Sequence, residues 1–172
     1  EDIWDSMQRK ETYATSGDRI LLWFNLIKEN ISIPMGGEIK TSENPTFTVK
    51  AVGALKQKPG CPDFGVTSFS TDDIETLCKN ECYNPSDERK IITRIEVIKI
   101  NPQLNSKENV SDLVKDPWKV FNCPSSESGC SVTFSDDSFL NEGRDAAYYV
   151  RAIEESSPTI NSENLRCELD DS

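Results

Sequence analysis

The sequence predicts a mainly β protein, an immunoglobulin-like β-sandwich of roughly seven short strands with an N-terminal helix and a short helix in a cysteine-rich insertion. Three observations predict this class. Several short segments alternate apolar and polar residues with the period of a strand. One segment, 91–100, is rich in β-branched residues, and turn-forming glycine, proline, asparagine and serine separate these segments.

The segment 91–100 is the clearest strand, because it holds five isoleucines and a valine. With strand alternation, the odd positions from Ile91 to Val97 form a mostly apolar face and the even positions from 92 to 98 a mixed face. We therefore expect a central strand with a partner at each edge. We expect its apolar face to meet the apolar face of segment 145–154, either Tyr148, Val150 and Ala152 or the alternate set Tyr149 and Ile153.

The chain begins with elements that fit this class. Segment 1–10 predicts a short amphipathic helix, because Ile3, Trp4 and Met7 recur at helical spacing. A polar exit, 11–17, follows and ends at Gly17. Segment 19–27 alternates well enough to be the first strand.

Two more elements precede the central strand. Segment 46–53 predicts a strand that follows a turn at 34–37 and places Phe47, Val49 and Ala51 on one face. Segment 56–85 breaks the strand pattern and holds three of the six cysteines. We expect a loop-and-helix insertion tied by disulfides, with a short helix capped by Ser70 and Asp73.

The rest of the chain returns to the sheet. We expect a polar connector at 102–116, an aromatic pair returning to the body at 116–121, and a short edge strand at 130–134. Segment 145–154 contains alanines that a helix would accept. Its Tyr-Tyr-Val core favours a strand, and we expect it to be one.

Six cysteines and no histidine favour disulfides over a zinc site, with free buried thiols as the second alternative. Cys123 and Cys130 bracket a turn that can bring their Cβ atoms within bridging distance. Cys78 and Cys82 are one helical turn apart, where a bridge would strain a regular helix. The disulfide candidates are Cys61, Cys78, Cys82, Cys123, Cys130 and Cys167.

The charge and the missing motifs exclude several functions. A net charge of −11 repels phosphate and anionic lipid, so neither nucleic acid nor a membrane is an expected partner. The absence of histidine removes His-dependent catalysis, and no phosphate-binding or nucleophile motif occurs. We expect no enzyme activity and no cofactor. Solvated turns explain the acidic loop 136–145 best, and calcium binding there is the alternative.

Several motifs occur together and in order: Arg-Lys-Glu-Thr-Tyr-Ala-Thr-Ser-Gly-Asp-Arg-Ile at 9–20, Pro-Met-Gly-Gly at 34–37, Gly-Cys-Pro-Asp-Phe-Gly at 60–65, Ile-Thr-Arg-Ile-Glu-Val at 92–97 and Tyr-Tyr-Val-Arg-Ala-Ile at 148–153. With these motifs the chain resembles the C-terminal part of a family of large, uncharacterised bacterial proteins related to the PHP (polymerase and histidinol phosphatase) metal-dependent phosphoesterases.

The resemblance implies an organisation. Residues 1–18 would be the remnant of an upstream metal-dependent barrel, and residues 19–172 the β-sandwich domain. None of the barrel's motifs is present here, so no catalytic residue is carried over. The resemblance also implies an extracytoplasmic location, periplasmic or secreted, and a partner for Cys167 beyond the end of this chain.

Three functions follow as expectations. The first is a non-catalytic accessory domain of a PHP-like hydrolase, and the alternative is a free-standing extracellular module that binds a ligand or glycan. Two or more solvent-facing aromatics on one sheet face would favour the glycan module, whereas their burial would favour the accessory domain. The third is calcium-stabilised adhesion.

Overall fold

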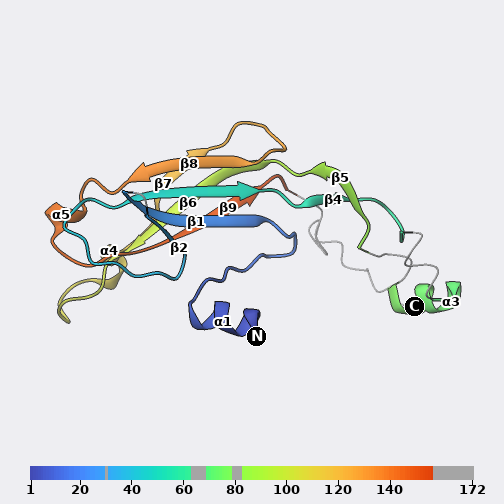
Figure 1. Cartoon of the computed structure of the whole chain (residues 1–172), viewed down its shortest axis with the longest axis horizontal. Coiled ribbons are helices and arrows are strands. Elements are labelled where there is room, and N and C mark those ends of the chain that lie inside the picture. The colour runs from blue at the N-terminus through green and yellow to red at the C-terminus, as the bar shows by residue number, and fades with distance from the viewer. Residues whose placement is uncertain (30, 63–68, 79–82, 157–172) are drawn as a thin grey trace, which may run out of the picture.

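The computed structural model describes residues 1–29, 31–62, 69–78 and 83–156, and it shows a mainly β protein built from antiparallel sheets (Figure 1). A four-stranded sheet has the order β2-β1-β3-β8, a three-stranded sheet β7-β6-β9, and a small two-stranded sheet β4-β5. The predicted fold class is confirmed at this level. The strand order does not by itself assign the immunoglobulin-like connectivity, which stays a prediction.

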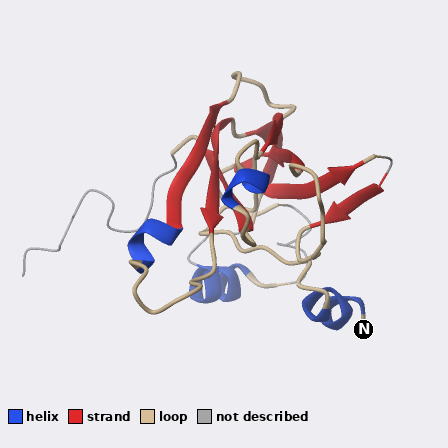
Figure 2. Cartoon of the chain, turned by 90° about the vertical axis from the view of Figure 1, so that its left-hand side faces the viewer, coloured by secondary structure: helices blue, strands red, loops and turns tan. Residues whose placement is uncertain are grey.

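The bounds of the elements are as follows. The four-stranded sheet consists of β1 (Leu21–Lys28), β2 (Ile31–Pro34), β3 (Thr46–Val52) and β8 (Cys130–Ser135). The three-stranded sheet consists of β6 (Ile92–Ile100), β7 (Val114–Asn122) and β9 (Ala147–Glu154), and the small sheet of β4 (Leu55–Gln57) and β5 (Pro85–Arg89). The described helices are α1 (Asp2–Gln8), α3 (Thr71–Cys78), α4 (Val110–Leu113) and α5 (Phe139–Glu142). Figure 1 and Figure 2 both show α1 apart from the strands.

The core lies between the two larger sheets and takes side chains from both. The buried cluster unites Phe24, Phe47, Val49, Ala51, Cys130 and Phe134 of the four-stranded sheet with Ile92, Ile95 and Val97 of β6. The Phe47 ring is at its centre, 5.5 Å from Phe24, 5.4 Å from Phe134 and 4.6 Å from Tyr148 between ring centroids. The predicted buried face of β3, with Phe47, Val49 and Ala51, is therefore confirmed.

The central position of β6 is also confirmed, since it pairs with β7 on one edge and β9 on the other. Ile95 lies opposite Ala152 and Val97 opposite Val150, so β9 is a strand and presents the first of its two predicted faces to the core. The predicted face of β6 is wrong at its start. The register with β9 shifts between Ile92 and Arg94, which places Ile92 in the core and leaves Thr93 exposed.

Four strands were not predicted, namely β2, β4, β5 and β7. The expected connector 102–116 is shorter than predicted, because it includes α4 and the first residues of β7. Each of β2, β5 and β7 contains a proline, which weakens the sequence signal for a strand. Their extended state follows from pairing with a neighbour, which no local pattern reports.

The two predicted helices are present. The predicted cap of α3 is confirmed, because the Asp73 backbone N–H donates to Ser70 Oγ at 3.1 Å and the Ser70 backbone N–H donates to Asp73 Oδ2 at 3.2 Å. The Ser70 hydroxyl also donates to Asp73 Oδ2 at 2.7 Å, and this bond first, then the bond from the Ser70 backbone N–H, lowers the pKa of Asp73. At the start of the chain, α1 carries the predicted apolar side chains, but none of its residues is buried.

Gly129 provides a test of how closely β3 and the turn before β8 pack. Its φ of +94° is left-handed, and a Cβ there would lie 2.2 Å from the Ala51 carbonyl oxygen. Gly143 is also left-handed, with φ +59°, but its surroundings are open. We expect Gly143→Ala to lower the free energy of unfolding by roughly 1–2 kcal/mol for the backbone alone. Gly129→Ala should lower it by at least about 1 kcal/mol more, because it also forces an overlap.

Urea unfolding of both variants beside the parent chain measures this difference. Equal losses for the two variants would contradict the close approach of Gly129 to β3.

Candidate functional site

A buried polar cluster is the strongest candidate for a site in the described structure, and it lies at the end of the sandwich where α5 is found (Figure 1). Lys99 comes from β6, Asp136 follows the last residue of β8, and Glu142 ends α5. The side chains of Lys99 and Asp136 are both 0% exposed. Lys99 Nζ lies 2.5 Å from Asp136 Oδ2 and 2.7 Å from Glu142 Oε2.

Further donors hold the Asp136 carboxylate. Tyr148 Oη donates to Oδ2 at 2.6 Å, and the backbone N–H of Ser138 donates to Oδ1 at 3.1 Å. Ser138 Oγ lies 2.8 Å from Asp136 Oδ1 and 3.0 Å from Glu142 Oε1, and its single proton serves one of them at a time. The backbone N–H of Asp136 donates to the Pro45 carbonyl at 3.0 Å, which fixes the residue to the turn before β3.

Aromatic rings cover this cluster. Lys99 Nζ lies 5.3 Å from the centre of the Trp118 ring. Lys119 Nζ lies 4.6 Å from the centre of the same ring and donates a hydrogen bond to the Ser135 carbonyl. Trp118 also contacts Tyr148, with ring centroids 5.9 Å apart. The Trp118 and Tyr148 rings therefore contribute to closing the ion pair to solvent.

Burial and pairing act against each other on the pKa values. For Asp136 the largest influence is burial, which raises the pKa, but the hydrogen bonds from Lys99, Tyr148 and Ser138 outweigh it and hold the pKa below its ordinary value. The pKa of Glu142 is lowered in the same way, against its burial, by Lys99, Ser138 and Lys115. Burial first, and then the bond to Asp136, raises the pKa of the Tyr148 hydroxyl.

The acidic loop 136–145, the candidate calcium site, thus belongs to this cluster. Its Asp136 and Glu142 carboxylates pair with the Lys99 ammonium instead. Calcium at Asp136 and Glu142 would have to displace the Lys99 ammonium. Within the described residues no group of three or more acidic, cysteine or histidine side chains could hold a metal ion. The sequence reasoning missed Lys99. Its signal was present, since Lys99 continues the inward alternation of Ile95 and Val97.

The chemistry open to this cluster is internal to the chain. Lys99 and Asp136 are both closed to solvent, so an external substrate has no access to the amine or to the carboxylate. The Lys99 amine is held against the Asp136 carboxylate, with the Glu142 carboxylate beside it. Such a group can exchange protons, and the amine can form a covalent bond with the adjacent carboxyl group.

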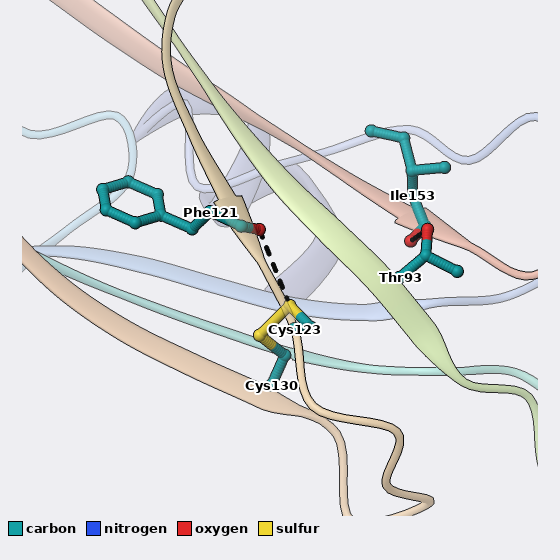
Figure 3. The surroundings of a disulfide bond; sticks show 5 residues. All are labelled: Thr93, Phe121, Cys123, Cys130 and Ile153. Carbon is teal, nitrogen blue, oxygen red and sulfur yellow. Dashed lines mark hydrogen bonds between the residues drawn. A yellow bond between two sulfur atoms is a disulfide. The ribbon is translucent and has the colours of Figure 1, made fainter.

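A disulfide fastens the other end of β8 (Figure 3). Cys123, which follows β7, bridges to Cys130, the first residue of β8, and their Cα atoms are 5.7 Å apart. The backbone N–H of Cys123 donates to the Thr93 carbonyl at 3.0 Å. The Phe121 carbonyl lies 4.0 Å from Cys123 Sγ, a contact only, because a bridged sulfur carries no proton to donate.

The other cysteines are described only in part. Cys61 is also disulfide-bonded. The side chain of Cys78 and the whole of Cys82 and Cys167 lie outside the described residues, so their expected pairing stays a prediction.

The outer face of the three-stranded sheet carries a second charge network. Glu96 of β6 lies opposite Arg151 of β9, and its carboxylate accepts from Arg94 at 2.8 Å and lies 2.8 Å from Arg151 Nη2. Arg151 also pairs with Asp116 of β7. The pKa of Glu96 is lowered, chiefly by the hydrogen bond from Arg94. The network ties three strands together on a solvated face.

An open hollow of about 530 Å³ lies where the small sheet meets the start of β1. Leu21 and Leu55 line it, together with Arg19, Tyr83 and Arg89. Arg19 is stacked 5.0 Å above the Tyr83 ring, and Arg89 donates to the Gly53 carbonyl at 2.8 Å. The ring and both guanidinium groups are therefore already engaged.

Residues 1–59 match a family model described as a protein of unknown function (DUF3604). No curated protein and no solved structure matches the chain. Among the described helices, none is both long and apolar enough to cross a membrane.

Tyr148 tests whether the buried cluster stabilises the fold. Its hydroxyl donates to a buried carboxylate, so Tyr148→Phe should lower the free energy of unfolding by about 1.5–3 kcal/mol. Tyr149→Phe, at the exposed neighbouring position, is the matched control and should stay within about 0.5 kcal/mol of the parent chain. Chemical denaturation of the three proteins measures both effects, and equal stabilities for the two variants would contradict the role of Tyr148.

Glu96 gives a test that depends on pH. Its folded pKa is lowered, so its carboxylate stabilises the fold above the ordinary glutamate pKa, and this contribution is lost as the pH falls through the folded pKa. The stability difference between the parent and Glu96→Gln should be largest near neutral pH, at most about 1 kcal/mol, and should shrink below about pH 4.

Arginine substitutions provide the control for this prediction. In a chain carrying Arg94→Gln and Arg151→Gln, the same Glu96→Gln change should show a much smaller dependence on pH. A difference that stays constant from neutral to acid pH in the parent background would contradict the assignment.

Proposed function

We propose that this chain is a non-catalytic accessory β-sandwich of a larger PHP-like hydrolase, and that α1 docks it against an upstream barrel domain of the same polypeptide. The observation that carries the proposal is the apolar face of α1. Ile3, Trp4 and Met7 are 76%, 65% and 59% exposed. An exposed apolar patch of this kind, on a chain that is otherwise strongly acidic, is typical of an interaction surface.

The helix is held in place for such a contact. Gly36 has φ +90°, and a Cβ there would lie 2.4 Å from the Arg9 carbonyl oxygen, so the end of α1 is packed against the turn after β2. Lys10 Nζ lies 3.1 Å from Glu38 Oε1, and Tyr13 Oη donates to the Ile20 carbonyl at 3.1 Å. A helix fixed at its end presents its apolar side chains in one direction.

The family match supports treating the helix and the sheet as one unit. It runs from residue 1 to residue 59, through α1 and into the small sheet, and so crosses the boundary at residues 18 and 19 that we propose between barrel remnant and sandwich. The PHP relationship rests on the motif resemblance alone. That resemblance implies that the neighbouring domain is a metal-dependent barrel.

The alternative, a free-standing glycan-binding module, finds less support. Trp118 and Tyr148 pack against the core. Among the described strand residues, exposed aromatic rings lie singly, Trp23 on β1 and Tyr149 on β9, in different sheets. Two solvent-facing rings on one sheet face, the arrangement that would favour sugar stacking, do not occur among the described strand residues.

We also propose an extracytoplasmic location. The disulfide between Cys123 and Cys130 and the bonded state of Cys61 support it, because disulfides persist in oxidising compartments and are rare in the cytosol.

Two measurements test the proposed function together. The purified chain, incubated with a range of phosphoesters and added divalent metals, should show no turnover; hydrolysis that depends on this chain would overturn the non-catalytic assignment. In the longer polypeptide that includes the upstream residues, amide exchange across Asp2–Gln8 should be slower than in this chain alone, because the docked barrel covers α1.

Strand β1 is the internal control, since its exchange should be the same in both proteins. Exchange at α1 that is equally fast in both would overturn the docking role.

A further inference from the structure

We propose that Lys99 and Asp136 condense into an intramolecular amide, an isopeptide bond, and that Glu142 relays the proton. The inference does not depend on the proposed function. Three features of the cluster lead to it. The amine and the carboxylate are both fully buried, they are in contact, and a second carboxylate touches the amine.

The reacting groups are in position. Lys99 Nζ is 2.5 Å from Asp136 Oδ2, so the carboxyl carbon lies one C–O bond beyond that contact, within the ~3–3.5 Å approach at which held groups react. Ser138 and Tyr148 fix the plane of the carboxylate through their bonds to its two oxygens. Holding both groups in one place gives a high effective concentration, which favours joining over the separate charged forms.

The surroundings favour the product. Two opposite charges without solvent carry a desolvation cost that their attraction only partly offsets. Condensation removes both charges, leaves an amide N–H beside Glu142 and the amide oxygen Oδ1 beside its Ser138 donors, and releases a water molecule from a site that is closed to solvent. The reverse reaction would need water to return to that site.

The reaction can be written with every atom accounted for. A proton passes from the Lys99 ammonium to Asp136 Oδ2 across their contact, which gives a neutral amine and a neutral acid. Nζ then attacks Cγ and forms the C–N bond, while Oδ1 takes the negative charge and the Ser138 N–H stabilises it. The Glu142 carboxylate accepts a proton from the nitrogen and returns it to Oδ2. The C–O bond breaks, and Oδ2 leaves as water.

The lowered pKa of Asp136 slows the attack of Nζ on Cγ. The Asp136 carboxyl group is mostly ionised, so the neutral acid that reacts is a minor population. The bond therefore forms once per chain, as a slow maturation after folding has brought β6 and β8 together.

The mass of the intact protein tests the proposal. After the disulfides are reduced, the 172-residue chain should weigh less than its sequence by one water molecule, and a tryptic digest should contain a branched peptide that joins Lys99 to Asp136. A full sequence mass would overturn the proposal. A water loss that fragment spectra place in a cyclic imide, or between Lys99 and Glu142, would overturn it as well.

Matched variants test the relay. Glu142→Gln keeps the shape of the side chain but cannot carry the proton, and it should retain the full mass. Lys115→Gln removes another partner of Glu142, at 3.3 Å, without touching Asp136, and it should still lose water. Lys99→Met should abolish the loss. A cross-link in Glu142→Gln would overturn the role of Glu142. The mass of the parent chain alone decides whether the bond forms, even if a variant fails to fold.

Discussion

The pairing of Lys99 with Asp136 is the contact on which the closure of the sandwich depends. A lysine at a position that points into the core has to be matched, because an unpaired buried ammonium would destabilise the fold by several kcal/mol. Its partner comes from the other sheet, so the contact fixes β6 and β8 relative to each other. Among the described strands, β8 has only β3 as a hydrogen-bonded neighbour, and the polar cluster and the Cys123–Cys130 disulfide fasten its two ends.

The sequence predicted the strands whose own residues demand burial. β1, β3, β6 and β9 alternate apolar side chains, and their existence followed from that pattern. The buried face followed for β3, and for β6 except where its irregular pairing with β9 places Ile92 inward, whereas two faces stayed open for β9 and none was predicted for β1. β5, with the sequence Pro-Ser-Asp-Glu-Arg, has no alternating apolar side chains that would favour burial. It is a strand because β4 supplies its hydrogen bonds, and pairing between distant segments leaves no mark in a local pattern.

The candidate site was half visible in the sequence. The acidic loop was noticed because carboxylates crowd within a few residues, whereas the lysine that neutralises them lies on another strand and reads as one charged residue in an apolar run. Only the fold brings the two together. Histidine count and charge, in contrast, are properties of the whole chain, and the functions they argue against follow without any structure.

The turn at 124–129 joins two strands of different sheets and is largely exposed, as a preferred site for proteolysis would be. Cys123 and Cys130 lie directly on either side of it. A chain cut at this turn would remain one covalent molecule, with β8 retained in its sheet. The disulfide therefore makes the fold tolerant of a break in the backbone between Cys123 and Cys130.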